Sequence, residues 1–405
     1  MGRELNVRAV LTGRVMQRGD ALIVSAELMD VAQESQLWGE RYNRKLDDIF
    51  EVQAEVASQI SEKLRLRLTP EEKKRLTKQP TQNREAYQLL LKAQYYTSKW
   101  TAERIRQGMA YARQAIEADP GYAAAYAWIA ATYNSLAAFG SLPRREASPM
   151  AKAAALKALE IDETLADAHV SLGVAQAFYE WDWSGGERSL KRALELNPNY
   201  AWAHFCYGSW LLYMGRRQEG LAEVRRSVEL DPLSANFSSG LAFQFYLARD
   251  YDHALEQYQK ALELDPNFVY TRPLLARVYS EKGMHEEAIR ECEEMVSLSG
   301  GVPFSKVTLG LVLAKAGQLD EARKILEELK GQPKLDNISE YLVAALHAIL
   351  GEKEEAFKLL ERAYEQRNNW LVFLSAPTFD SLRDDPRFAD LCRRIGLPES
   401  VSAQT

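Results

Sequence analysis

The chain has 405 residues, of which 51 are lysine or arginine and 57 are aspartate or glutamate, so its formal net charge is −6 at pH 7. A hydrophobic fraction of 46% with 27% charged residues is typical of a folded protein and argues against intrinsic disorder. The acidic balance argues against a nucleic-acid-binding protein as a whole, because phosphate binding requires a concentrated basic face. No signal peptide is visible and no apolar run reaches the ~18 residues of a membrane span, so we expect a cytoplasmic chain by default.

The first 68 residues predict a small α/β module. Two β-rich stretches, Val7–Met16 and Ala21–Asp30, flank a turn at residues 17–20 and predict a hairpin. In the second stretch apolar residues alternate with polar ones, which is the period of a half-buried strand. A third strand is predicted at Gln36–Tyr42. An amphipathic helix follows, with apolar residues at Ile49, Val52, Val56, Ile60 and Leu64.

The amino-acid sequence of this module, at residues 5–15, 36–42 and 47–50, resembles the second half of a TolB-like α/β domain. In that family a preceding strand and helix complete the sheet, so the resemblance implies that residues 1–68 form only a partial module. Either residue 1 is not the natural start, or the sheet has an exposed edge. In the second case we expect self-association through that edge.

Residues 69–84 are polar and predict a charged linker. Lys73, Lys74, Arg75 and Lys78 stand beside Glu71 and Glu72, so the basic run is interrupted. Because no aromatic residues accompany it, we interpret it as a solvated face rather than a site for nucleic acid or anionic lipid.

A period of 34 residues dominates the rest of the chain. Prolines recur at Pro198, Pro232 and Pro266, and a turn glycine recurs at Gly215, Gly283, Gly317 and Gly351. A small residue recurs in the same spacing at Gly220, Ala254, Ala288, Ala322 and Ala356. Such a period predicts stacked helical hairpins that need their neighbours to bury a core.

These columns resemble the tetratricopeptide pattern, which has a small residue in each helix and a proline at the end of the repeat. Seven blocks between Tyr126 and His347 carry the first-helix signature, and a degenerate block precedes them from Glu85 to Pro120. The predicted fold is therefore mainly α: an α-α superhelical solenoid of about eight repeats over residues 85–368, preceded by the partial α/β module. We expect an insertion at Ser135–Pro149 to lengthen one loop, and an irregular turn at Trp181–Trp183.

The last residues predict a cap for the open end of the solenoid. Residues 369–398 include a short helix, Arg387–Ile395, opened by Asp385 and Pro386. Residues 399–405 are expected to fray as a flexible tail.

No catalytic constellation, metal site or cofactor site is visible, so we expect a protein that is not an enzyme. Cys206, Cys292 and Cys392 are scattered and form no CxxC pair. The stretch from His285 resembles a zinc-protease HExxH motif, but the second histidine is missing, since Ile289, followed by Arg290, stands in its place. The histidines are therefore expected to have packing roles.

Candidate partner-binding residues follow from the tetratricopeptide resemblance, because in that family the first helices of the repeats line a concave groove. The alternative is that such side chains pack against the adjacent repeat. Co-chaperone domains of this family bind a carboxylate with a lysine and asparagine clamp, which the corresponding residues here do not support. The candidate groove residues are Trp202, Phe205, Ser209, Leu212, Tyr213, Phe243, Tyr246, Tyr270, Arg277 and Lys315.

The expected function is a protein-protein interaction scaffold that binds a peptide or partner protein in this groove. A second reading stays open, because the combination of modules resembles bacterial signalling proteins whose upstream part is a serine/threonine kinase, a winged-helix domain or a nucleotide cyclase. The kinase-linked group matches best at residues 79–87 and 379–398, yet the chain has no kinase motifs. On that reading the chain is a sensory or regulatory portion separated from its effector domain. If the parent protein is anchored in a membrane with this portion on the outer side, the chain lies outside the cytoplasm.

Overall fold

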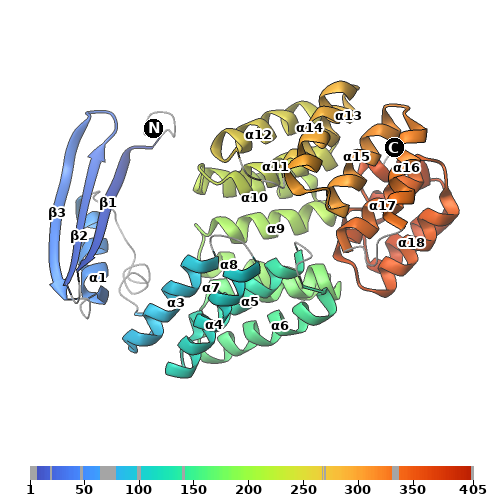
Figure 1. Cartoon of the computed structure of the whole chain (residues 1–405). Coiled ribbons are helices and arrows are strands. Elements are labelled where there is room, and N and C mark those ends of the chain that lie inside the picture. Colours follow the sequence, from blue (N-terminus) through green and yellow to red (C-terminus); the bar gives the residue numbers. More distant parts are fainter. Residues whose placement is uncertain are drawn as a thin grey trace. The chain divides into compact units, whose positions relative to one another are not determined.

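The computed structural model describes residues 7–18, 21–45, 49–63, 79–97, 102–138, 142–266, 268, 271–330 and 337–402. The chain divides into two compact units, residues 1–100 with 104–122 and residues 101–103 with 123–405. The strands lie in the first unit, and most of the helices lie in the second (Figure 1).

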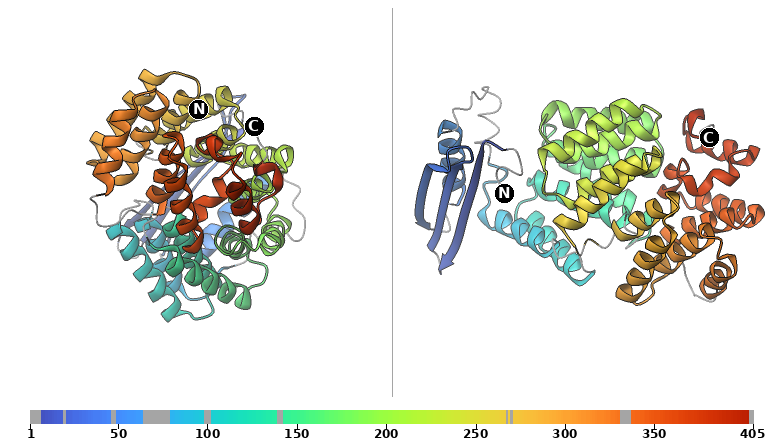
Figure 2. Two further views of the ribbon diagram at one scale, coloured as in Figure 1. Left: turned by 90° about the vertical axis from the view of Figure 1, so that its right-hand side faces the viewer. Right: turned by 90° about the horizontal axis from the view of Figure 1, so that it is seen from above.

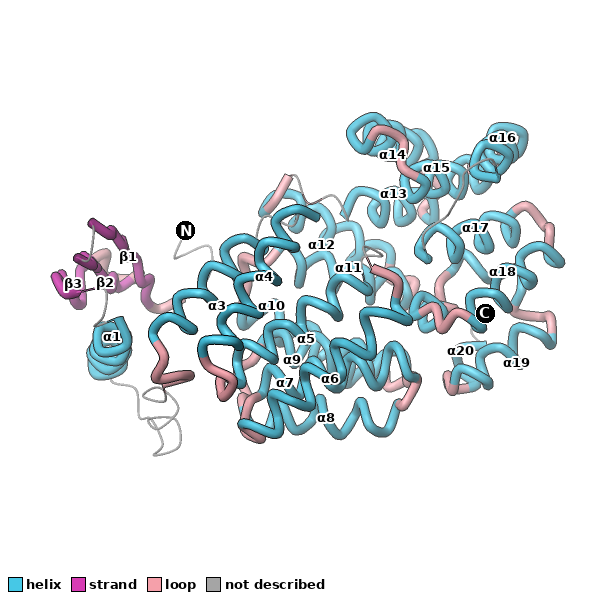
Figure 3. Tube along the Cα trace, turned by 60° about the horizontal axis from the view of Figure 1, so that its bottom comes forward, coloured by secondary structure: helices cyan, strands magenta, loops and turns pink. Residues whose placement is uncertain are grey.

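The first unit opens with a three-stranded antiparallel sheet in the order β1-β2-β3. Strand β1 (Ala9–Arg18) pairs with β2 (Ala21–Asp30), which pairs with β3 (Ser35–Lys45) through a bulge between Leu28 and Met29. Helix α1 (Ile49–Lys63) lies on one face of this sheet (Figure 3). The predicted hairpin, third strand and helix are confirmed, and the third strand is longer at both ends than predicted.

Helix α1 packs on β3 and β2, so the small core of this module lies over these two strands. Trp38 is buried there, and its indole N–H donates to Oε1 of Gln59 over 2.8 Å, which ties β3 to α1. Leu11 and Val15 of β1 pair with residues of β2 that face α1, yet they remain 49% and 66% exposed. The apolar face of the sheet is therefore left open over β1.

The first helical pair, α3 (Arg84–Thr97) and α4 (Ala102–Ala118), belongs mainly to the first unit. Asn83 begins α3, because its Oδ1 accepts from the backbone N–H of Ala86 over 3.1 Å. The same side chain donates from Nδ2 to the carbonyl oxygen of Ala118 over 2.8 Å. One asparagine thus caps one helix and fixes the end of the other.

Antiparallel helical pairs follow along the second unit, so the described residues contain eight pairs with α3/α4. This confirms the predicted α-α solenoid. No helix in the described part of the chain is both long and apolar enough to cross a membrane. The pairs are α5 (Ala123–Ala138) with α6 (Arg144–Ile161), α7 (Ala166–Val174) and its π-helical extension η2 (Ala175–Glu180) with α8 (Trp183–Leu196), α9 (Ala201–Tyr213) with α10 (Arg217–Leu230), α11 (Ala235–Leu247) with α12 (Tyr251–Leu264), α13 (Thr271–Glu281) with α14 (His285–Ser299), α15 (Pro303–Lys315) with α16 (Leu319–Lys330), and α17 (Asn337–Ile349) with α18 (Lys353–Glu365).

Close packing within a pair depends on the small residues of the repeat. A Cβ added to Gly208 of α9 would lie 2.8 Å from the carbonyl oxygen of Gly220 in α10, and a Cβ on Gly220 would lie 2.8 Å from that of Gly208. Real Cβ atoms do not approach that closely, so both helices need glycine at this crossing. The next repeat places Ala254 in the same column, where it is fully buried.

One predicted loop is instead largely helical. Within Ser135–Pro149, α5 continues to Ala138 and α6 begins at Arg144, so the insertion lengthens both helices. The alanines, arginines and glutamate of this stretch are good helix formers, which explains the outcome. The predicted irregular turn is present: Trp181 has a φ of 58°, and Asp182 caps α8 by accepting from the backbone N–H of Gly185.

The C-terminal segment, residues 369–402, consists of η3 (Asn369–Phe373), η4 (Pro377–Leu382), α19 (Pro386–Ile395) and α20 (Glu399–Ser402). Helix α19 packs on α18, and the segment also reaches α8, where the Trp183 indole N–H donates to the carbonyl oxygen of Ile395 over 2.8 Å. The right view of Figure 2 draws this segment, in the deepest red, at the end of the second unit where the last helical pairs lie. The prediction that residues 399–405 fray is wrong for residues 399–402, because they form α20 and Val401 is 4% exposed and packs into the core, while residues 403–405 lie outside the described residues.

Candidate functional site

Aromatic side chains of α9 and α11 gather where the groove was predicted. The rings of Trp202 and Phe205 stack with their centroids 5.3 Å apart. Phe237 of α11 lies 6.2 Å from the first ring and 5.7 Å from the second. Trp202 and Phe205 are half-buried, so two of the predicted residues present aromatic surface at a partly open place. We call these three residues the aromatic cluster.

Tyr213 and Ser209 lie deeper, where they hold the side chain of Gln244. Nε2 of Gln244 donates to the Tyr213 hydroxyl over 3.3 Å and to Oγ of Ser209 over 3.4 Å. Tyr213 is 7% exposed and Ser209 is 5% exposed. Burial raises the pKa of Tyr213 above its usual range, so the phenol stays neutral.

Phe373 of the C-terminal segment packs on predicted groove residues. Its ring meets those of Tyr213 and Phe243 edge to face, with centroids 5.3 Å and 5.0 Å apart. Phe243 in turn stacks on Tyr246, which is 1% exposed. The segment that the sequence predicts as an end cap therefore covers the side of α9 and α11 that carries Tyr213 and Phe243.

The remaining predicted residues differ in accessibility. Arg277 of α13 is only 4% exposed. It lies near Tyr258, whose pKa is raised well above its usual value by burial, and the charge of Arg277 opposes that rise. Lys315 of α15 is half-buried and forms an ion pair with Glu281. Tyr270 lies outside the described residues.

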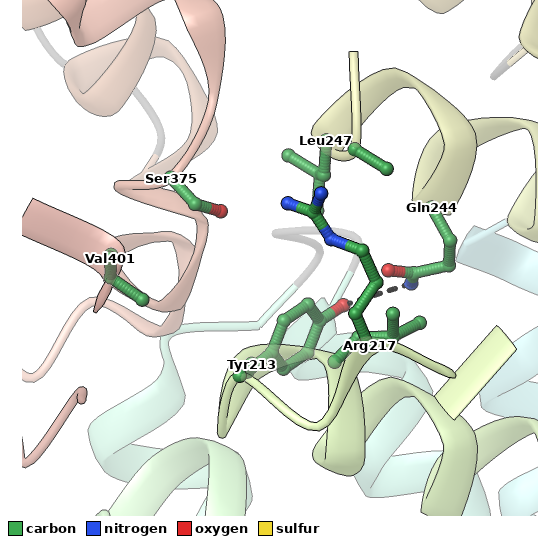
Figure 4. A pocket seen from close by; sticks show the side chains of 9 residues that line it. Tyr213, Arg217, Gln244, Leu247, Ser375 and Val401 are labelled. Carbon is green, nitrogen blue, oxygen red and sulfur yellow. Dashed lines mark hydrogen bonds between the residues drawn. The ribbon is translucent and has the colours of Figure 1, made fainter. Parts of the chain in front are cut away.

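A small pocket lies between α9, α10, α11 and the C-terminal segment (Figure 4). Only two predicted residues, Leu212 and Tyr213, line it. Gln244 is the one polar residue in the apolar run Leu241–Leu247, and that signal could have marked it for a polar contact. The lining residues that sequence reasoning missed are Gly215, Arg217, Gln244, Leu247, Ala248, Ser375 and Val401.

The surroundings of Cys292, Cys392 and His204 suit a role in packing rather than in chemistry. Burial raises the pKa of both Cys292 and Cys392 to about 12, so neither is a thiolate at neutral pH. His204 contacts Oε2 of Glu223 through Nδ1 over 2.5 Å and the carbonyl oxygen of Pro198 through Nε2 over 2.9 Å. Over the described ranges, no three His, Cys, Asp or Glu side chains are arranged to hold a metal ion.

Part of the helical array is similar to the tetratricopeptide repeats of known proteins. Two tetratricopeptide-repeat family models match residues 235–268, which span α11 and α12, and residues 257–290. Among solved structures, the tetratricopeptide protein TTC0263 of Thermus thermophilus is 21% identical, with 48% of this chain and 98% of that chain covered and a TM-score of 0.40. A tetratricopeptide repeat protein of Parabacteroides merdae is 15% identical, with 62% and 98% covered and a TM-score of 0.46.

Curated relatives match over shorter stretches. Putative adenylate cyclase 3 of Rhizobium meliloti is 36% identical over 127 residues, which are 31% of this chain and 22% of the relative. Transcriptional regulator HilA of Salmonella typhimurium is 28% identical over 146 residues, which are 36% of this chain and 26% of the relative. The matches thus span about a quarter of the length of these relatives. The chain carries tetratricopeptide repeats within an α-solenoid, together with a small N-terminal antiparallel sheet.

Proposed function

We propose that the chain is a non-enzymatic scaffold that binds a protein or peptide partner on the inner face of its repeats. Tetratricopeptide arrays present extended surfaces of this kind. The aromatic cluster carries the proposal, because Trp202 and Phe205 are large, half-buried and stacked, as interface anchors are. Tyr213, Tyr246 and Arg277 support this surface from the interior, since their side chains are buried.

A peptide library displayed on phage and screened against the whole chain tests the proposal. Selected peptides should bind the wild type, and Phe205→Ala should weaken them by about tenfold or more, as loss of an interface anchor does. Leu156→Ala is the matched control, since Leu156 lies on α6 and is 48% exposed. A library that yields no binder, or binders that ignore Phe205→Ala, would contradict the assignment.

The second candidate function is the sensory or regulatory portion of a larger bacterial signalling protein. The matches to a putative adenylate cyclase and to a transcriptional regulator favour it, because this chain spans only a fraction of each. An antibody raised against the chain should then detect, in the native cells, a polypeptide much larger than 45.9 kDa. A single band near 45.9 kDa would argue for the freestanding scaffold.

The open edge of β1 supports self-association as a further property of the N-terminal module. Strand β1 has one neighbouring strand within the described residues, which leaves its other edge unpaired. The exposed Leu11 and Val15 lie along that edge. A second copy of the chain is therefore the partner that we propose for this edge.

A further inference from the structure

The pocket between α9, α10, α11 and the C-terminal segment is small but chemically varied. Its enclosed volume is about 40 Å³, and its lining residues Gly215 and Arg217 are exposed, so it encloses the end of a ligand rather than a whole drug-sized molecule. Figure 4 shows that Arg217, Gln244 and Ser375 reach it from three different parts of the fold.

Gln244 supplies a buried hydrogen-bond acceptor. The side chain is 2% exposed, and its Nε2 donates to Ser209 and Tyr213, which fixes the orientation of the amide. Its Oε1 has no hydrogen-bond partner among the described residues. Because a buried carbonyl oxygen without a donor is unfavourable, an N–H group of a ligand in the pocket would be bound there.

Arg217 supplies a cation. It is the first residue of α10 and is exposed, and none of the ion pairs in the described part of the chain involves it. Its neighbour Arg216, by contrast, pairs with Glu187 and Glu219. A cation at a helix N-terminus opposes the helix dipole, so Arg217 is poorly placed to stabilise α10 itself. In Figure 4 its guanidinium and the hydroxyl of Ser375 face each other across the pocket.

The rest of the pocket is apolar and held in place. Leu212, Leu247 and Val401 contribute aliphatic side chains. Ser375 is fixed through its backbone, because Nη2 of Arg383 donates to its carbonyl oxygen over 2.9 Å. The pocket thus combines a guanidinium, a hydroxyl, a free amide oxygen and an aliphatic wall.

We propose that this pocket binds an N-acylated α-amino acid with a free carboxylate and an aliphatic side chain. The carboxylate lies against Arg217 and Ser375, since a guanidinium binds planar carboxylates in a forked geometry. The amide N–H donates to Oε1 of Gln244, and the side chain contacts Leu212, Leu247 and Val401. Such a group is found both on a free N-acyl amino acid and at the carboxyl end of a protein chain.

This binding is separate from the aromatic surface proposed above. The pocket shares Leu212 and Tyr213 with the predicted groove but contains none of Trp202, Phe205 and Phe237. Phe205→Ala should therefore leave the pocket ligand bound. Failure of one proposal is distinguishable from failure of the other.

Titration of the full chain with N-acetyl-L-leucine, followed by NMR, tests the proposal. We expect saturable shifts with a dissociation constant in the millimolar range. N-acetyl-L-leucinamide, which lacks the carboxylate, should bind at least about tenfold more weakly, because it loses a charge-assisted hydrogen bond. Arg217→Gln should weaken the acid by a similar factor, and Arg216→Gln, the matched control outside the pocket, should not.

A pentapeptide that ends in leucine distinguishes the two sources of the ligand. If the pocket takes a chain end, the peptide with a free carboxylate binds more tightly than N-acetyl-L-leucine, and its amidated form does not. If the pocket takes a small molecule, the two acids bind equally. The proposal is overturned if neither acid gives saturable shifts, or if acid and amide bind alike, or if Arg217→Gln changes nothing.

Discussion

Arg249 and Asp380 form a bidentate ion pair, with Nη1 2.8 Å from Oδ2 and Nη2 2.6 Å from Oδ1, although 131 residues separate them in the chain. Arg249 has a φ of 63° and occupies the column in which Gly215, Gly283, Gly317 and Gly351 have a φ between 75° and 80°. An arginine there is strained, since the left-handed region costs a non-glycine residue about 1 kcal/mol. The ion pair accounts for an arginine at this strained position, because it ties the turn after α11 to Asp380 in the C-terminal segment.

Substitutions of Arg249 separate the strain from the ion pair. Arg249→Ala loses the pair and keeps the strain, whereas Arg249→Gly loses the pair and relieves the strain, so the glycine variant should unfold with a free energy about 1 kcal/mol higher than the alanine variant. The pair is partly exposed, so the glycine variant should lie within about 1 kcal/mol of the wild type. Urea unfolding followed by circular dichroism measures all three. An alanine variant as stable as the glycine variant would refute the strain.

The crossing of α9 and α10 gives a second prediction. Gly208→Ala and Gly220→Ala should each lower the free energy of unfolding by about 1–3 kcal/mol, because each new methyl group meets the backbone of the opposite helix. The double variant should lose less than the sum, since the first substitution already separates the helices. Thermal unfolding of the single and double variants tests this. Unchanged midpoints in the single variants would sink the explanation.

The repeats could be predicted from the sequence because each one repeats the same local requirements. A small residue at the helix crossing, a glycine in the left-handed turn and an apolar stripe recur every 34 residues, so errors in one block are corrected by the others. The exceptions carried information too. Arg249 and Trp181 replace glycine in the turn column, and both contact a distant part of the chain: Arg249 pairs with Asp380, and Trp181 stacks on Tyr364 of α18 with centroids 5.5 Å apart.

The fold-back of the C-terminal segment could not be predicted in this way. It depends on single contacts between distant residues, such as that between Trp183 and Ile395, which no period in the sequence encodes. The candidate site depends on the same contacts. Ser375 and Val401 line the pocket with Gln244 only because the segment folds onto α9 and α11. The pocket therefore could not be predicted from the sequence, whereas the aromatic residues of α9 could be predicted from their place in the repeat.

The contact between His204 and Glu223 gives a prediction about pH. Burial lowers the pKa of His204, but the hydrogen bonds to Glu223 and to the Pro198 carbonyl outweigh it, and the pKa is raised above the ordinary histidine value of 6.5. The folded state therefore holds this proton more tightly than the unfolded state, so the stabilisation is complete below the unfolded pKa of about 6.5 and is lost as the pH rises through the folded pKa.

His204→Gln isolates this contribution from other titrating groups. The difference in unfolding free energy between wild type and variant should be largest near pH 6 and shrink as the pH rises, in line with a histidine pKa of about 6.5 in the unfolded chain. His253→Gln is the control, since His253 contacts Asp250 from an exposed position on α12. A difference that stays constant between neutral and mildly acidic pH contradicts the assignment.

The edge of β1 gives the last prediction, which concerns self-association. Two copies of β1 paired antiparallel about Gly13 would set Leu11 of each copy opposite Val15 of the other, so that the exposed apolar residues cover one another. Leu11→Lys with Val15→Lys should abolish that pairing, because four lysines would then meet across the new edge.

Sedimentation velocity over a range of protein concentrations measures this association. The wild type should form a dimer, and the double variant should stay monomeric with an unchanged circular dichroism spectrum. Leu319→Lys is the control, since Leu319 is 40% exposed on α16 in the other unit and should leave the dimer intact. A wild type that is monomeric at every concentration would contradict the pairing of β1 with a second copy.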